Sequence, residues 1–124
     1  MKIAISYKKN GAPHVALFSV RVRDSVSVAY AALKRDTRIT DLNAGYLVVD
    51  VQFATSSRLY TYFTDQVYAP GAQVVVPTPD GEEIVTVVNC EIRSKQAINA
   101  VYPFDRIKTI LGREKDMPEM VDAN

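Results

Sequence analysis

The chain has no tryptophan, a single cysteine and no long apolar run. Because Cys90 has no second cysteine with which to form a disulfide, burial and hydrogen bonding must hold the fold together. The sequence has no recognisable signal peptide, and no stretch reaches the roughly 20 apolar residues of a membrane helix. We therefore expect an intracellular, cytoplasmic protein with no membrane role.

Neither sign of charge is in excess, since 15 basic residues face 14 acidic ones and the net charge is +1. This balance gives no overall electrostatic attraction to nucleic acid. The two halves nevertheless differ: residues 1–54 carry eight Lys or Arg against four Asp, and residues 55–124 carry seven against ten. We expect the basic half either to dock on an acidic half or to present a face to a polar ligand.

Recognisable catalytic and metal-binding motifs are also missing. The only histidine, His14, is far in sequence from Cys90, so a Cys–His pair would need a contact made by the fold. The five glycines are scattered singly, without a phosphate-binding loop or dinucleotide fingerprint. The carboxylates of Asp80, Glu82 and Glu83 fit a solvated turn, with metal binding or acid–base catalysis as the alternative. We predict a protein that is not an enzyme and has no catalytic residue, metal or cofactor.

Residues 1–54 carry the pattern of two strands, a helix and a further strand. The Asn10–Gly11 pair tolerates the positive φ angles of a type I′ turn and predicts a hairpin. Alternating side chains before and after this turn are typical of strands. The predicted ββαβ unit consists of strands at Lys2–Tyr7, His14–Val22 and Tyr46–Phe53 and a helix over residues 25–36.

The predicted helix has a start signal and an apolar face. Asp24 or Ser25 is expected to cap it, because a short side-chain oxygen accepts hydrogen bonds from the free N–H groups of the first turn. One stripe of the helix carries the apolar residues Val26, Ala29, Tyr30 and Leu33.

The second half has the signature of short strands joined by tight turns. Val74–Val76 and Ile84–Val88 are β-branched runs too short for helices, and Pro79–Gly81 has the composition of a hairpin turn. Residues 55–111 therefore predict a small antiparallel β-barrel, SH3-like or OB-like, on which the first unit packs. The fold class expected for the whole chain is α+β.

The end of the chain is less regular. Ser94–Ala100 is expected to form a loop or one helical turn, and Val101–Leu111 a closing strand or short helix. Residues 112–124 are charged, contain Pro118 and lack apolar periodicity, so they predict a flexible tail.

A family resemblance covers somewhat under half of the chain. The matching segments are Tyr60–Tyr62, Ala69–Gly71, Val74–Pro77, Pro79–Gly81, Ile84–Val88 and Ile107–Ile110. Their order resembles a small barrel of short bacteriophage-encoded proteins and the amino-terminal DNA-binding domain of the bacterial primosomal helicase. The usual aromatic close is replaced here by Tyr102–Phe104. The resemblance implies a barrel, and a phage accessory protein acting in the cytoplasm of the host cell.

The binding candidates are basic and aromatic side chains. Arg21 and Arg23 are expected to lie on the same side of a strand, and guanidinium groups suit phosphate oxygens. The remaining predicted phosphate ligands are Lys8, Lys9 and Arg38. The predicted stacking surfaces for bases are Tyr60, Tyr62 and Tyr102. The alternative is that the basic residues form a solvated face and the tyrosines belong to the core with their hydroxyls at its rim.

Two functions of different classes are consistent with these residues. In the first, a phage accessory or counter-defence protein captures a phosphate-bearing ligand, either nucleic acid or a nucleotide signal, in a pocket completed by homo-oligomerisation. In the second, the protein docks on a host enzyme or defence protein and inhibits it, with contacts made by strand addition.

Overall fold

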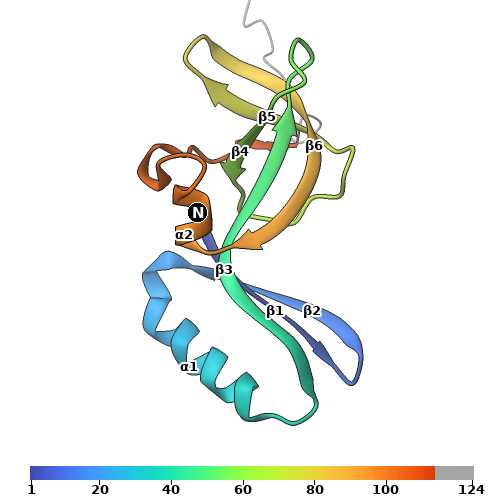
Figure 1. Ribbon diagram of the computed structural model, residues 1–124, viewed down its shortest axis with the longest axis vertical. Coiled ribbons are helices and arrows are strands. Elements are labelled where there is room, and N and C mark those ends of the chain that lie inside the picture. The colour runs from blue at the N-terminus through green and yellow to red at the C-terminus, as the bar shows by residue number, and fades with distance from the viewer. Residues whose placement is uncertain (114–124) are drawn as a thin grey trace, which may run out of the picture.

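A computed structural model describes residues 1–113 of the chain. About half of these residues belong to an antiparallel sheet that curls into a half-barrel, with α1 at the other end of the molecule (Figure 1). The elements in chain order are β1 (Lys2–Lys9), β2 (Ala12–Ser19), η1 (Val20–Val22), α1 (Arg23–Arg35), β3 (Ile39–Gln52), β4 (Leu59–Phe63), β5 (Gln73–Thr78), β6 (Gly81–Arg93), α2 (Lys95–Asn99), η2 (Phe104–Arg106) and β7 (Gly112–Arg113). The predicted combination of helix with a barrel-like sheet is thus present, whereas the finer division into a ββαβ unit and a small SH3-like or OB-like barrel stays a prediction.

Strand β3 joins the two ends of the sheet. Its first part, from Ile39 to Tyr46, pairs with β1, and its last part pairs with β4 and with β6. The sheet order is β2-β1-β3-β6-β5-β7, with β4 attached to β3. The predicted strand at Tyr46–Phe53 is therefore, except for Phe53, the last part of a longer strand, because the polar residues before it pair along β1.

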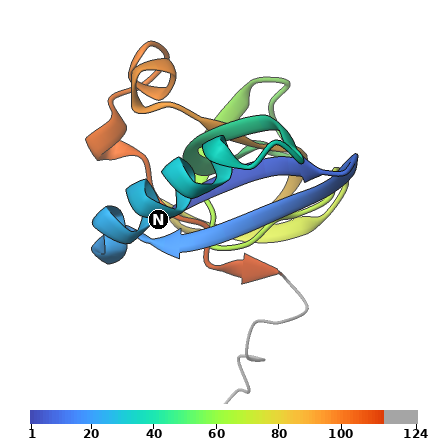
Figure 2. The same ribbon diagram turned by 90° about the horizontal axis from the view of Figure 1, so that it is seen from below.

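The β1–β2 hairpin turns where the sequence predicts. Asn10 and Gly11 have φ angles of 51° and 82°, as a type I′ turn requires, and Lys9 pairs with Ala12. Helix α1 lies across one face of this hairpin (Figure 2). Its buried Val26 packs with Ile3 and Ile5, and the predicted stripe of Ala29, Tyr30 and Leu33 packs beside it.

The predicted start of the helix is wrong. Strand β2 ends at Ser19, whose hydroxyl accepts a hydrogen bond from the Arg21 N–H at 3.3 Å and begins the 3-10 turn η1. This turn runs directly into α1 at Arg23, and the helix has no side-chain cap. Asp24 and Ser25 lie inside the helix rather than before it.

The curled end of the sheet holds the largest core cluster. It consists of Val49, Val51, Tyr68, Val74, Val76, Val85, Val87 and Ile110. The β5–β6 hairpin turns at Pro79–Asp80, with Thr78 paired to Gly81, so this predicted turn is confirmed. Strand β6 continues through Asn89 to Arg93 as predicted, with a register shift opposite Asp50 and Val51.

Gly45 allows β3 and β6 to pack closely. A Cβ atom at Gly45 would lie 2.6 Å from the carbonyl oxygen of Arg93, so β6 passes too close to β3 there for any side chain. The glycine permits this approach.

The last described segment forms backbone hydrogen bonds with both β4 and β5. Phe63 of β4 donates to the Lys108 carbonyl at 2.9 Å and accepts from the Ile110 N–H at 2.9 Å, while Leu111 donates to the Val75 carbonyl at 2.8 Å. Residues 94–111 thus combine the predicted alternatives, since α2 and η2 are short helices and the end of the segment is extended. Of the predicted tail, Gly112 and Arg113 form β7, and residues 114–124 lie outside the described residues.

Candidate ligand-binding groove

A groove of about 570 Å³ lies between β4 and the segments that surround it. Its walls come from residues 53–62, from the β5–β6 turn and from residues 101–108. This volume lies within the roughly 300–1,000 Å³ range of small-molecule sites. The groove is therefore large enough for a mononucleotide.

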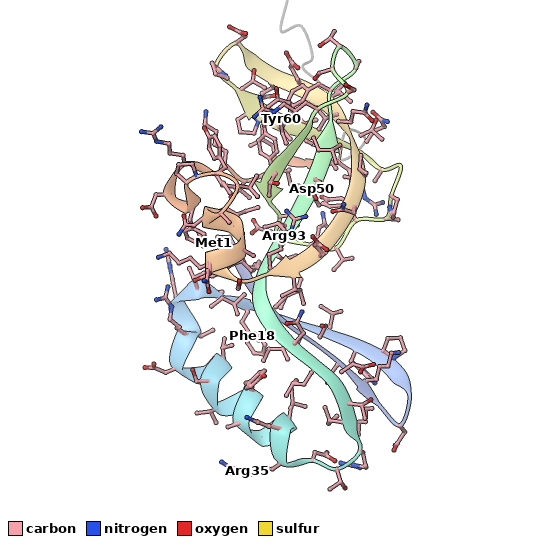
Figure 3. All side chains as sticks on the ribbon, in the orientation of Figure 1. Met1, Phe18, Arg35, Asp50, Tyr60 and Arg93 are labelled. Carbon is pink, nitrogen blue, oxygen red and sulfur yellow. The ribbon has the colours of Figure 1, made fainter. Side chains whose placement is uncertain are left out.

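The predicted stacking residues meet in this groove. Tyr60 and Tyr62 are alternate residues of β4 and Tyr102 comes from the segment after α2, and all three line the cavity. Tyr60 is 39% exposed and Tyr102 is 50% exposed. Figure 3 shows Tyr60 at the end of the molecule away from α1.

Packing fixes two of these rings. The Tyr60 ring meets Phe53 edge to face at 5.1 Å between centroids, and the Tyr62 hydroxyl donates to the Pro77 carbonyl at 3.3 Å. Burial, followed by the charge of Glu83, raises the pKa of Tyr62, so this phenol stays neutral at physiological pH. The groove therefore has preformed aromatic walls.

Three exposed cations line the same groove. The Arg58 guanidinium lies 5.2 Å from the Tyr60 ring centroid, and Arg106 and Lys108 come from the segment beside Tyr102. Within residues 1–113, none of the three belongs to an ion pair. Sequence reasoning missed these cations. The i, i+2 spacing of Arg58 and Tyr60 was the available signal, whereas nothing local connects either residue with Arg106 or Lys108.

Carboxylates also line the groove. Asp80 and Glu83, on the β5–β6 hairpin, line the groove and are exposed. Among the described residues no group of three or more acidic, histidine or cysteine side chains is arranged to hold a metal ion. A ligand in the groove thus meets both cations and carboxylates.

A buried ion pair supports β4 beside the groove. Asp50 of β3 accepts from both terminal nitrogens of Arg93, and Figure 3 shows these two side chains next to each other. Asp50 also accepts from the Thr61 hydroxyl at 2.7 Å, and Arg93 also contacts Glu91. Burial alone would raise the pKa of Asp50, but the hydrogen bonds from Arg93 and Thr61 outweigh it and lower that pKa. The network joins β3, β4 and β6, so its role is to hold the strand that carries Tyr60 and Tyr62.

The predicted phosphate ligands form two separate groups, and the first consists of Lys8, Lys9 and Arg38. Lys8 pairs with Asp41 at 3.3 Å, and Arg38 binds Asp36 through two nitrogens, at 3.0 and 2.7 Å. Hydrogen bonds from Arg38 hold the pKa of Asp36 well below its usual range, so the pair stays charged at neutral pH. Lys9 lies beside them, because the adjacent Asn10 donates to the Arg38 carbonyl at 3.0 Å.

Arg21 and Arg23 lie at the other end of α1. The expectation that they share one side of a strand is wrong, because Arg21 is in η1 and Arg23 is the first residue of α1. A helix of 13 residues spans about 20 Å and separates them from the group around Arg38. Neither group lines the groove.

His14 and Cys90, the two residues of a candidate Cys–His pair, lie far from each other. His14 stacks on Tyr7 with centroids 5.2 Å apart on the β1–β2 hairpin, whereas Cys90 packs against the core cluster of the curled end. Burial raises the pKa of the Cys90 thiol. The structure brings no Cys–His pair together in the described chain.

No protein-family description, curated protein or solved structure matches the chain. In the part of the chain that the structure describes, no helix is long and apolar enough to cross a membrane.

Proposed function

We propose that the groove captures a phosphate-bearing ligand, a nucleotide or a short single strand of nucleic acid, without catalysing its reaction. The observation that carries this proposal is the meeting of Tyr60, Tyr62 and Tyr102 with Arg58, Arg106 and Lys108 in one cavity.

Stacking supplies the first part of the binding energy. The half-exposed rings of Tyr60 and Tyr102 offer aromatic surface to a base, and such stacking is worth about 1–3 kcal/mol per base. The Arg58 guanidinium, which already lies over Tyr60, offers a second planar surface.

The charges orient the ligand. Phosphate oxygens favour the wall with Arg106 and Lys108, since both are exposed cations without an ion pair in residues 1–113. Asp80 and Glu83 repel phosphate from the β5–β6 hairpin and accept hydrogen bonds from the amino groups of a base. The ligand is therefore held in one direction.

We also infer the finer architecture that accompanies this site. The hydrogen bonds of residues 108–113 to both β4 and β5 support an SH3-like or OB-like barrel over residues 55–111, packed on a ββαβ unit over residues 1–54. The resemblance to phage-encoded barrels supports a counter-defence role in the host cytoplasm, for which sequestration of a nucleotide signal suffices.

The first experiment is to denature the purified protein and analyse the released material by absorbance and mass spectrometry. Fluorescence anisotropy then measures the binding of labelled oligonucleotides, and calorimetry the binding of nucleotides. Tyr60→Ala is expected to weaken binding by about 5- to 150-fold, which corresponds to the 1–3 kcal/mol of one stacked base. Affinity for an oligonucleotide should also fall steeply with salt.

The matched control is the double variant Arg21→Ala/Arg23→Ala, which changes two exposed cations outside the groove. It should bind as the wild type does. Loss of binding in this control together with normal binding by Tyr60→Ala would move the site to the first half. No binding of any nucleotide or oligonucleotide would overturn the proposal.

Exposed apolar residues at the groove favour a second candidate function, docking on a host protein. Val101 is 84% exposed and Leu59 is 45% exposed, and both line the groove with Pro77 and Pro79. This apolar rim suits contact with a host enzyme or defence protein, which the chain would inhibit. A stoichiometric host protein retained on the immobilised chain after nuclease treatment, and lost on Val101→Asp, would support this alternative.

A further inference from the structure

Strand β2 forms an outer edge of the sheet, since β1 is its only strand partner among the described residues (Figures 1 and 2). Its sequence, APHVALFS, contains no Lys, Arg, Asp or Glu. Val15 is 51% exposed and Leu17 is 38% exposed. Natural proteins protect such an edge with charged side chains, proline or bulges. This edge carries no charged Lys, Arg, Asp or Glu, and its one proline, Pro13, lies next to the turn, so Val15 to Ser19 are left without such protection.

The hairpin geometry fixes which backbone groups are free. In a two-residue hairpin the flanking pair, here Lys9 and Ala12, is a hydrogen-bonded pair. Hydrogen-bonded and non-hydrogen-bonded pairs alternate along an antiparallel ladder. The N–H and C=O groups of every second residue of β2 therefore point away from β1. These residues are Pro13, Val15, Leu17 and Ser19. No turn, loop or cap hydrogen bond within residues 1–113 uses the N–H or C=O groups of Val15 or Leu17.

We propose that two copies of the chain associate by antiparallel pairing of β2 with β2, with the twofold axis at Leu17. Pro13 has no N–H to donate, so the register that avoids it is favoured. With the axis at Leu17, Val15 lies opposite Ser19 of the second copy and Leu17 lies opposite its own equivalent. The pair at the axis exchanges two backbone hydrogen bonds. Each of the two Val15–Ser19 pairs adds one, from the Ser19 N–H to the Val15 carbonyl, because the Ser19 carbonyl accepts a hydrogen bond within η1, and the total is about four.

The side chains suit this register. Val15, Leu17 and Ser19 share the sheet face opposite α1, because Ile3 and Ile5, which pack on the helix, pair with Phe18 and Ala16. Opposed residues of an antiparallel pair lie on the same face, so the two Leu17 side chains meet across the axis.

The absence of charge on β2 favours a second copy of the chain as the partner of this edge. The edge is uncharged in both copies, so no like charges oppose each other along the shared strands. The twofold arrangement is also self-complementary, as the commonest closed dimers are. The association uses a surface away from the groove and does not depend on the proposed ligand.

Sedimentation velocity over a range of concentrations tests the association with the full chain. The wild type is expected to reach twice the monomer mass of 13.8 kDa. Leu17→Lys places two like charges at the axis and should leave only monomer, with an unchanged circular dichroism spectrum. The control Val28→Lys, at a 71% exposed position of α1, should remain dimeric.

Disulfide trapping tests the register. In a Cys90→Ser background, Leu17→Cys should give a covalent dimer on mild oxidation, because directly opposed hydrogen-bonded residues have Cα atoms about 5.5 Å apart, within disulfide reach. Val28→Cys should not. A monomer at every concentration, a dimer that survives Leu17→Lys, a dimer without the Leu17 crosslink, or an edge that pairs only with another protein would each overturn the proposal.

Discussion

Replacing Arg93 with methionine is expected to destabilise the chain more than any other single change to an exposed or half-buried charge. Methionine keeps much of the length of the arginine side chain but removes the guanidinium. Asp50 then keeps the Thr61 hydroxyl but loses its cation. A carboxylate whose side chain is 11% exposed is left without charge compensation.

Breaking one side of a buried ion pair costs about 3–5 kcal/mol. The Arg93 side chain is 22% exposed, so some water already reaches the pair and the lower end of this range applies, about 3 kcal/mol. For a domain of this size that loss lowers Tm by roughly 10 °C.

The pH dependence separates this mechanism from a simple loss of packing. In the wild type the pKa of Asp50 is lowered, so its stabilising effect is present above the unfolded pKa near 4 and disappears as the pH falls through the folded value. In Arg93→Met burial acts without the arginine and should raise that pKa. The variant then loses stability as the pH rises above about 4, so the difference in unfolding free energy should be larger at pH 7 than at pH 4.

Urea denaturation followed by circular dichroism at both pH values measures this difference. The double variant Asp50→Asn/Arg93→Met is the control, because it removes both charges and keeps the shape of residue 50. It should recover about 2 kcal/mol at pH 7 relative to Arg93→Met, since no uncompensated charge remains buried. Equal destabilisation at both pH values, with no recovery in the double variant, would refute the electrostatic reasoning.

Three further predictions concern packing. Gly45→Ala should lower the unfolding free energy by at least about 1–3 kcal/mol in urea titrations, because its Cβ would meet the Arg93 carbonyl; unchanged stability would contradict the close approach of β6. Phe63→Ala should cost about 3–5 kcal/mol, since Phe63 is 1% exposed and its ring packs against Phe104 and Tyr46, and a smaller loss would mean that the cluster refills the cavity. Cys90 should react with iodoacetamide at pH 8 much more slowly in the folded chain than in urea, because burial raises its thiol pKa; equal rates would place the thiol in solvent.

Local chemistry explains the parts of the fold that the sequence predicts well. Asn10–Gly11 and Pro79–Gly81 specify their turns by backbone conformations that few other residues adopt, and Val26, Ala29, Tyr30 and Leu33 specify a helix face by spacing alone. The first part of β3 gives no such signal, because Thr40, Asp41 and Asn43 are polar and exposed. Pairing with β1, far away in the sequence, makes this segment a strand.

Local sequence signals predict some features of the groove, whereas others depend on contacts between distant segments. Tyr60 and Tyr62 could be placed on one side of β4 from their spacing, whereas their approach to Tyr102 depends on the path of the chain after β6. Arg21 and Arg23 were expected on one side of a strand because alternation continues in the sequence to Val22. The Ser19 hydroxyl ends the strand earlier by bonding the Arg21 N–H, and a single side-chain hydrogen bond of this kind leaves no periodic trace.

The long strand β3 has a consequence for synthesis on the ribosome. Its buried part, Leu47 to Val51, takes its lateral partners from β4 and from β6, which is translated much later. Until Gly81–Arg93 has emerged, the nascent chain therefore holds β1, β2 and α1 next to a β3 whose other edge is open. An unpaired apolar edge is the feature that chaperones protect in growing chains. The rate at which residues 53–93 are translated thus sets how long the chain is exposed to aggregation.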